Sequence, residues 1–202
     1  MGALLVVSKQ AMSGLPNIEP VTLLIILFAL ELPRETPAAI TVFILLQGVL
    51  YGFGLWWAMY LYVWYLLALL AWLLRRMDHA LLWALFSGLY GLCFGGLCAA
   101  VYLFAKTPAF ALSWWLSGLS YDALHGAGNF AIMLLLYRPL RKALRTARRQ
   151  IGYWSLPLQP SISLSGRCFF VCRIFIAFSV QIHGMFTPNS GRSVVFMVYY
   201  IG

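Results

Sequence analysis

The sequence has very little charge for its length. Only 9% of its 202 residues are charged and 63% are hydrophobic, whereas a soluble domain is close to half apolar and a quarter charged. A water-soluble fold of this size needs a polar surface that such a chain cannot supply. The composition therefore predicts a protein of the lipid bilayer, with room for about six short spans of roughly 20 residues each.

The motifs of enzymes and metal sites are also missing. There is no HExxH or GxSxG sequence, no nucleotide-binding loop, and no pair of carboxylates that would share a catalytic role. The four cysteines lack the spacing of a metal site, and Cys93 and Cys98 lie in an apolar stretch where cysteine behaves as a small hydrophobic residue. We therefore expect no catalytic residue, no metal and no cofactor, and any ATP hydrolysis would take place on a separate protein.

Six of the 14 basic residues lie together after the last apolar stretch. The formal net charge is +9, and a basic cluster is formed within twelve residues by Arg138, Arg141, Lys142, Arg145, Arg148 and Arg149. Basic clusters beside a membrane span set its orientation and contact anionic lipid. No RNA- or DNA-binding module accompanies the cluster, so we expect the lipid bilayer and not a nucleic acid as its partner.

Helix breakers divide the first part of the chain into six apolar segments. These segments cover residues 1–13, 20–32, 37–50, 56–74, 80–104 and 109–137. With both termini in the cytoplasm, the outer connections carry Lys106 alone, and the inner ones carry Arg34, Arg75, Arg76 and the basic cluster. This bias agrees with the positive-inside rule. The sequence predicts a compact all-α bundle of six transmembrane helices over residues 1–149, with N- and C-termini cytoplasmic.

The two ends of the chain are expected to depart from this pattern. Residues 1–13 are too short to cross a bilayer alone and are interpreted as the remnant of a longer, truncated first helix. Residues 150–202 contain no acidic residue, and polar residues interrupt their apolar stretches. They are interpreted as a divergent, poorly ordered or non-native extension without a function, or, over residues 168–186, as a poor seventh span.

The sixth segment carries polar side chains at helical spacing. One stripe with spacings of 3, 4, 3 and 4 contains Trp115, Gly118, Asp122, His125 and Asn129, which places these residues on one side of a helix. An ionisable side chain in a membrane helix is costly and normally faces the protein interior or a wet cavity. The stripe is interpreted as a ligand-binding face. The alternative is an Asp–His pair that only holds helices together.

Small residues form a second stripe, on the fifth segment. It contains Ala84, Gly88, Gly91, Gly95 and Cys98. Small residues at this spacing let helix backbones approach closely. We expect the stripe to serve packing, with the sixth segment as a candidate neighbour.

Aromatic residues gather at the expected outer ends of the spans. Trp56, Trp57, Tyr60 and Tyr62 open the fourth segment, and most of these rings are expected to anchor the protein at the membrane interface. A minority would stack on a flat ligand, and Trp115 is the best candidate because it shares the polar stripe.

The first loop places Asn17 and Glu19 on the outer side, close to two prolines. Glu19 would either close over a ligand or cap the following helix at its positive end. The sequence does not decide between these two roles.

Four stretches together resemble the substrate-specific S component of energy-coupling factor (ECF) transporters. They are LPNIEPVTLLIILFAL (15–30), GVLYGFGLWW (48–57), SGLYGLCFGGLC (87–98) and WLSGLSYDALHGAGNF (115–130). The resemblance covers residues 1–145 and implies a bundle in the bacterial cytoplasmic membrane that binds a vitamin or related micronutrient from outside. It also implies docking on a transmembrane coupling subunit carried by two ATPase subunits, whose ATP hydrolysis topples the bundle.

In this family the ligand sites use the outer loops and the later helices. The resemblance therefore assigns substrate binding to Asn17, Glu19, Trp115, Asp122, His125 and Asn129. The family's first helix commonly presents alanines four residues apart to the coupling subunit, and here Ala3 and Ala11 do not have that spacing.

Two other classes of function compete with nutrient capture. One is a structural or assembly protein of the membrane without a small-molecule ligand, which would tolerate apolar residues on the polar stripe. The other is an intramembrane enzyme that uses Asp122 and His125 as acid and base, but a nucleophile or metal set is missing.

Overall fold

The computed structural model describes residues 1–12, 14 and 18–150, and this part of the chain is entirely α-helical apart from its connections. The helices are α1 (Gly2–Ala11), α2 (Val21–Glu31), α3 (Thr36–Tyr51), α4 (Leu55–Leu73), α5 (Ala80–Ala105), α6 (Pro108–Ser117) and α7 (Leu119–Gln150). The prediction of an all-α protein is confirmed for these residues. The predicted extension beyond Gln150 lies outside them.

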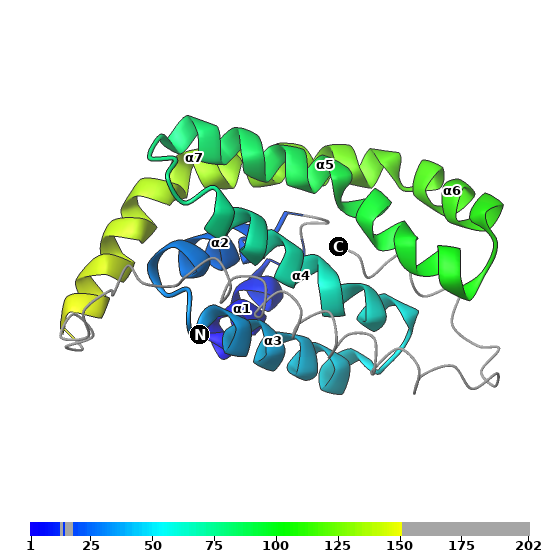
Figure 1. Ribbon diagram of the computed structural model, residues 1–202, viewed down its shortest axis with the longest axis horizontal. Helices are drawn as coiled ribbons and strands as arrows, with labels where there is room; N and C mark the ends of the chain where they lie inside the picture. The colour runs from blue at the N-terminus through cyan, green and yellow to red at the C-terminus, as the bar shows by residue number, and fades with distance from the viewer. Residues whose placement is uncertain (13, 15–17, 151–202) are drawn as a thin grey trace, which may run out of the picture.

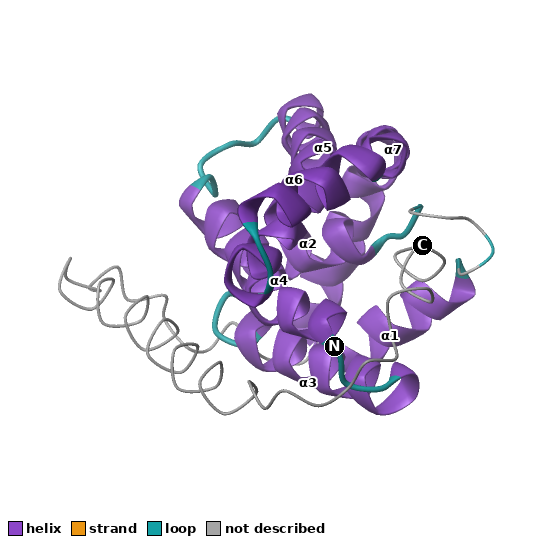
Figure 2. Ribbon diagram, turned by 90° about the vertical axis from the view of Figure 1, so that its right-hand side faces the viewer, coloured by secondary structure: helices purple, strands orange, loops and turns teal. Residues whose placement is uncertain are grey.

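The helices form three tiers, which Figure 1 shows from the side and Figure 2 from the end of the bundle. The upper tier contains α5, α6 and α7, the middle tier α2 and α4, and the lower tier α1 and α3. The tiers touch where α4 packs on α5, α2 on α7, and α3 on α4. Because α2 lies in the middle, nine of its 11 residues are buried.

Five of the predicted segments each correspond to one helix, α1 to α5, within a few residues. The prediction of one continuous sixth segment is wrong, because α6 ends at Ser117 and α7 begins at Leu119. At the break, the Gly118 N–H bonds the carbonyl of Trp115, three residues back, at 2.9 Å. Glycine is a weak helix former and a common site of such breaks.

Two described helices are long and apolar enough to cross a membrane: α4 with 19 residues and α5 with 26. Helices α2 and α3 are apolar but shorter. One outer face of α5 is also apolar, with Leu81, Leu85 and Leu89 between 54% and 60% exposed. A continuous apolar surface of this kind is unfavourable in water. Both features support association with a membrane.

Glycine allows α5 and α7 to run side by side. A Cβ atom added at Gly91 would lie 2.9 Å from the backbone N and Cα of Gly126, and one at Gly88 would lie 3.2 Å from the Gly126 carbonyl oxygen. Only glycine fits where two backbones come this close. The prediction that the small residues of the fifth segment pack against the sixth is confirmed.

The basic end of α7 turns back to the middle tier beyond Pro139, the one proline inside this helix. Arg141 and Arg145 both donate from Nε to Oε1 of Glu31, at 2.7 and 2.9 Å, and Arg148 donates to the Glu31 carbonyl. Glu31 is only 5% exposed. Part of the basic cluster therefore neutralises a buried carboxylate at the end of α2. From the sequence, the whole cluster was expected to contact lipid.

The glycine contact can be tested by Gly91→Ala. The new methyl group would meet the backbone of Gly126, so we expect a loss of about 1–3 kcal/mol from overpacking, larger than the gain of about 1 kcal/mol in helix propensity. Thermal unfolding of the detergent-purified protein measures this. Gly14→Ala is the control, because a Cβ there meets nothing within 4 Å. Equal stability of the two variants would contradict the close packing of α5 and α7.

Candidate functional site

A buried ion pair joins α1 to the residue before Pro20, at the start of α2. Lys9 Nζ lies 2.9 Å from Glu19 Oε2, donates to the Tyr60 hydroxyl at 3.3 Å, and is 5.8 Å from the centroid of that ring. Lys9 and Glu19 are 9% and 8% exposed. A buried charge is stable only with such partners. Glu19 thus neutralises Lys9, and the N-terminus of α2 at Pro20 has no side-chain cap.

Lys9 is a site residue that the sequence analysis did not select. It lies inside the first apolar segment. That position was itself a signal, since an ammonium group among apolar side chains requires a nearby anion. The sequence alone could not identify Glu19 as that anion, because the pairing depends on how α1 and α2 are placed in the fold.

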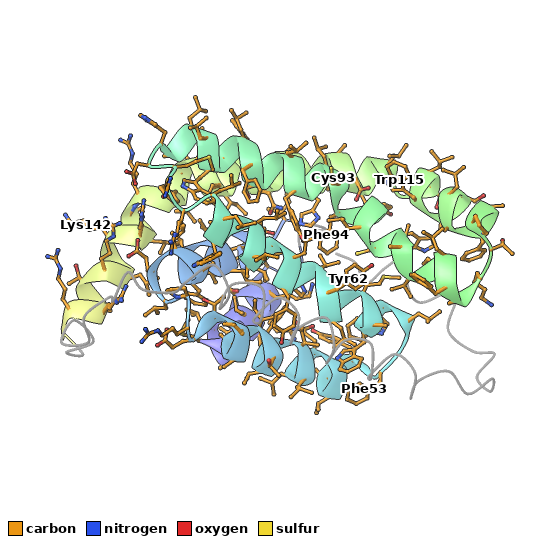
Figure 3. The ribbon with its side chains drawn as sticks, in the orientation of Figure 1. Phe53, Tyr62, Cys93, Phe94, Trp115 and Lys142 are labelled. Atoms are coloured by element: carbon orange, nitrogen blue, oxygen red, sulfur yellow. The ribbon has the colours of Figure 1, made fainter. Side chains whose placement is uncertain are left out.

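Aromatic rings connect this ion pair to α7. Tyr60 meets Trp64 edge-on at 5.5 Å between centroids, Trp64 meets Phe94 at 5.5 Å, and Phe94 meets His125 at 4.8 Å. Figure 3 shows Phe94 between α5 and α4. Tyr60 is only 7% exposed and its neighbour Trp57 only 3%. The interpretation of the aromatic residues of α4 as interfacial anchors is therefore wrong for these two.

His125 ends this aromatic series in the interior. It is 3% exposed, and in the described part of the chain its Nε2 atom has no hydrogen-bond partner. A buried polar atom without a partner is unfavourable. This nitrogen is therefore a position where a ligand or water would gain a hydrogen bond.

Asp122 lies one turn before His125 on α7 and contacts α5. Its Oδ1 atom accepts a hydrogen bond from the Gly95 N–H at 2.9 Å, and a Cβ at Gly95 would collide with the carboxylate. Trp115 of α6 interacts with the same carboxylate and packs on Gly96. Neither Asp122 Oδ2 nor Trp115 Nε1 makes a hydrogen bond of normal geometry. Oδ1 thus joins α7 to α5, whereas Oδ2 can still accept a hydrogen bond.

Asn129 connects α7 to two other helices. Its side-chain Nδ2 atom donates to Thr22 Oγ1 of α2 at 3.2 Å. Its backbone carbonyl accepts a hydrogen bond from Ser87 Oγ of α5 at 3.4 Å. The side chain is 2% exposed. These contacts support the alternative in which a polar residue of the stripe holds helices together.

The structure divides the predicted site residues into groups. Glu19 pairs with Lys9, His125 lies at the other end of the aromatic series, Trp115 and Asp122 lie together near Gly95, and Asn129 bonds α2. Asp122, His125 and Asn129 are all at least 94% buried, which agrees with the predicted interior face. The predicted site residue Asn17 lies outside the described residues. Within the described part of the chain, no three His, Cys, Asp or Glu side chains gather as metal ligands would.

The Lys9–Glu19 pair can be tested by a double-mutant cycle. Lys9→Met leaves the Glu19 carboxylate buried without its partner, so we expect a loss of about 3–5 kcal/mol. Lys9→Met combined with Glu19→Gln should recover most of that loss, because no charge remains buried. Unfolding in detergent provides the measurement, and Lys106→Met, at an exposed position, is the matched control. Additive losses in the double variant would show that the two charges do not interact.

Comparison with known proteins gives no relative for this chain. No family model matches it, and neither a curated protein nor a solved structure does. The contacts described above and the sequence resemblance are therefore the grounds for a functional proposal.

Proposed function

We propose that this protein spans the bacterial cytoplasmic membrane several times and captures a small vitamin-like molecule, as the substrate-specific subunit of an ECF-type importer. The observation that carries the proposal is the set of buried polar groups of which some remain unsatisfied, above all His125 Nε2. In an apolar bundle such groups are costly and mark functional sites. The two long apolar helices support the location in a membrane.

The residues around His125 favour one class of ligand. Lys9 and Glu19 neutralise each other, so a ligand there would meet donors and acceptors without a net charge. Phe94 is the ring next to His125, with Trp64 beyond it, and aromatic rings offer apolar faces for stacking. A flat heterocycle with polar edges and little net charge fits this combination, because it would stack on a ring and bond the imidazole.

The proposed transport cycle follows the resemblance to the S components. The bundle would receive the nutrient from outside and dock on a transmembrane coupling subunit. Two separate ATPase subunits would hydrolyse ATP, and the bundle would tilt so that the site opens to the cytoplasm. In this cycle the described residues would contribute the binding groups.

Nutrient capture predicts that a small heterocyclic compound co-purifies with the protein and is identified by mass spectrometry. His125→Ala should weaken binding of that compound by about 1–3 kcal/mol, because its polar edge would lose a buried partner. Isothermal titration with the identified compound measures the change. His79→Ala, at an exposed position, is the matched control. Absence of any bound compound, or equal affinity in the two variants, would count against nutrient capture.

The packing contacts favour a second candidate, a structural or assembly protein of the membrane. Asn129 and Asp122 each bond a neighbouring helix, and such bonds stabilise a bundle without any ligand. Under this alternative, ligand assays would stay negative while Asn129→Leu lowers stability. Under nutrient capture, His125→Ala changes affinity more than it changes stability.

The proposed N-in, C-in topology predicts opposite labelling of two exposed positions. In a variant without its native cysteines, Lys106→Cys should react with a membrane-impermeant maleimide in intact cells. Arg76→Cys should react only after permeabilisation, since the inner connections carry the basic residues. Both positions are exposed at the ends of long helices, so the reagent can reach them. Labelling of both in intact cells would exclude this topology.

A further inference from the structure

The basic end of α7 borders a pocket that the proposed uptake does not use. The pocket has a volume of about 350 Å³, which lies in the range of small-ligand sites. Its basic and acidic lining consists of Arg138, Arg141, Lys142, Arg145, Arg149 and Asp78. The lining thus contains five cations and one carboxylate. Figure 3 shows the cation Lys142 at the end of the bundle away from Trp115.

Among the described residues, Glu31 and Asp78 are the acidic side chains that pair with the pocket's arginines in the contacts below. Glu31 bonds Arg141 and Arg145. Asp78 is 3.7 Å from Arg141, and its side chain is 84% exposed, so solvent screens that pair. Arg138 and Lys142 are exposed and lie four residues apart on α7, where like charges repel each other. An anion in the pocket would remove this repulsion.

The surface next to the pocket is apolar and continues the same face of α7. Leu135 is 72% exposed and lies three residues before Arg138, which in turn lies four residues before Lys142. Residues at these spacings share one side of a helix. A molecule bound here would therefore meet cations at one end and leucine at the other, which matches an amphiphile with an anionic head.

We propose that this pocket is a specific site for the phosphate group of an anionic lipid, whose acyl chains lie along Leu135. The arginines hold the phosphate through charge-assisted hydrogen bonds, and the buried Glu31 fixes the orientation of Arg141. This site rests on the proposed membrane location but not on nutrient capture, because it lies at another part of the bundle from His125 and the Lys9–Glu19 pair.

The test uses the full chain, purified in a neutral detergent, with phosphatidylglycerol as the probe and native mass spectrometry as the measurement. Phosphatidylglycerol should bind in a defined one-to-one complex that phosphatidylcholine does not form. Arg138→Gln combined with Lys142→Gln should weaken that complex roughly tenfold. Arg75→Gln combined with Arg76→Gln removes the same charge from a neighbouring turn outside the pocket and should leave the affinity unchanged.

Three results would overturn the lipid site. Equal losses in the two double variants would show only a diffuse attraction to basic residues. Equal binding of phosphatidylcholine would show that the phosphate charge is not recognised. Inorganic phosphate or glycerol 3-phosphate binding as tightly as the lipid would assign the pocket to a soluble anion. The Lys142→Gln variant alone, at an exposed position, should also bind less lipid and provides the readout if the double variant does not fold.

Discussion

Buried carboxylates determine how the helices of this protein fit together. The chain has five acidic residues, and three of them, Glu19, Glu31 and Asp122, are at most 8% exposed. Each bonds a different helix: Glu19 holds α1, Glu31 holds the basic end of α7, and Asp122 holds the backbone of α5. A buried charge that loses its partner costs several kcal/mol. A shift of any of these helices along its axis would therefore be strongly opposed.

Much of the helix content followed from the sequence, because the apolar segments and their breakers are local features. The approach of α5 to α7 was also predictable, since small residues such as Gly91 have few other roles in a long helix. Contacts between distant segments were not. Nothing in the sequence near Glu31 shows that Arg141 and Arg145 would reach it, and the break at Gly118 interrupts a stretch that is apolar on both sides.

The polar residues that α7 carries, Asp122, His125 and Asn129, differ in role in a way that the sequence did not resolve. These residues were expected to act together, either on a ligand or in packing. The structure separates them. Asn129 bonds α2 through its side chain and α5 through its backbone carbonyl, and Asp122 bonds α5 through one of its two oxygens, whereas His125 Nε2 has no partner among the described residues. The same helix thus contributes to stability at one end of the stripe and has free hydrogen-bonding capacity in its middle. The neighbouring helices, and not the spacing along the sequence, determine which residue packs and which keeps free hydrogen-bonding capacity.

Pro139 has a consequence for where α7 can leave an apolar environment. Proline has no N–H to donate, so the carbonyl oxygen of Leu135, four residues earlier, lacks its usual donor within the helix. Leu135 is 72% exposed, and hydrocarbon offers this oxygen no hydrogen bond. In a bilayer this oxygen would need a substitute donor from water, a lipid headgroup or a neighbouring side chain. The backbone at this turn, directly before the first arginine of the basic cluster, therefore favours a polar surrounding over hydrocarbon.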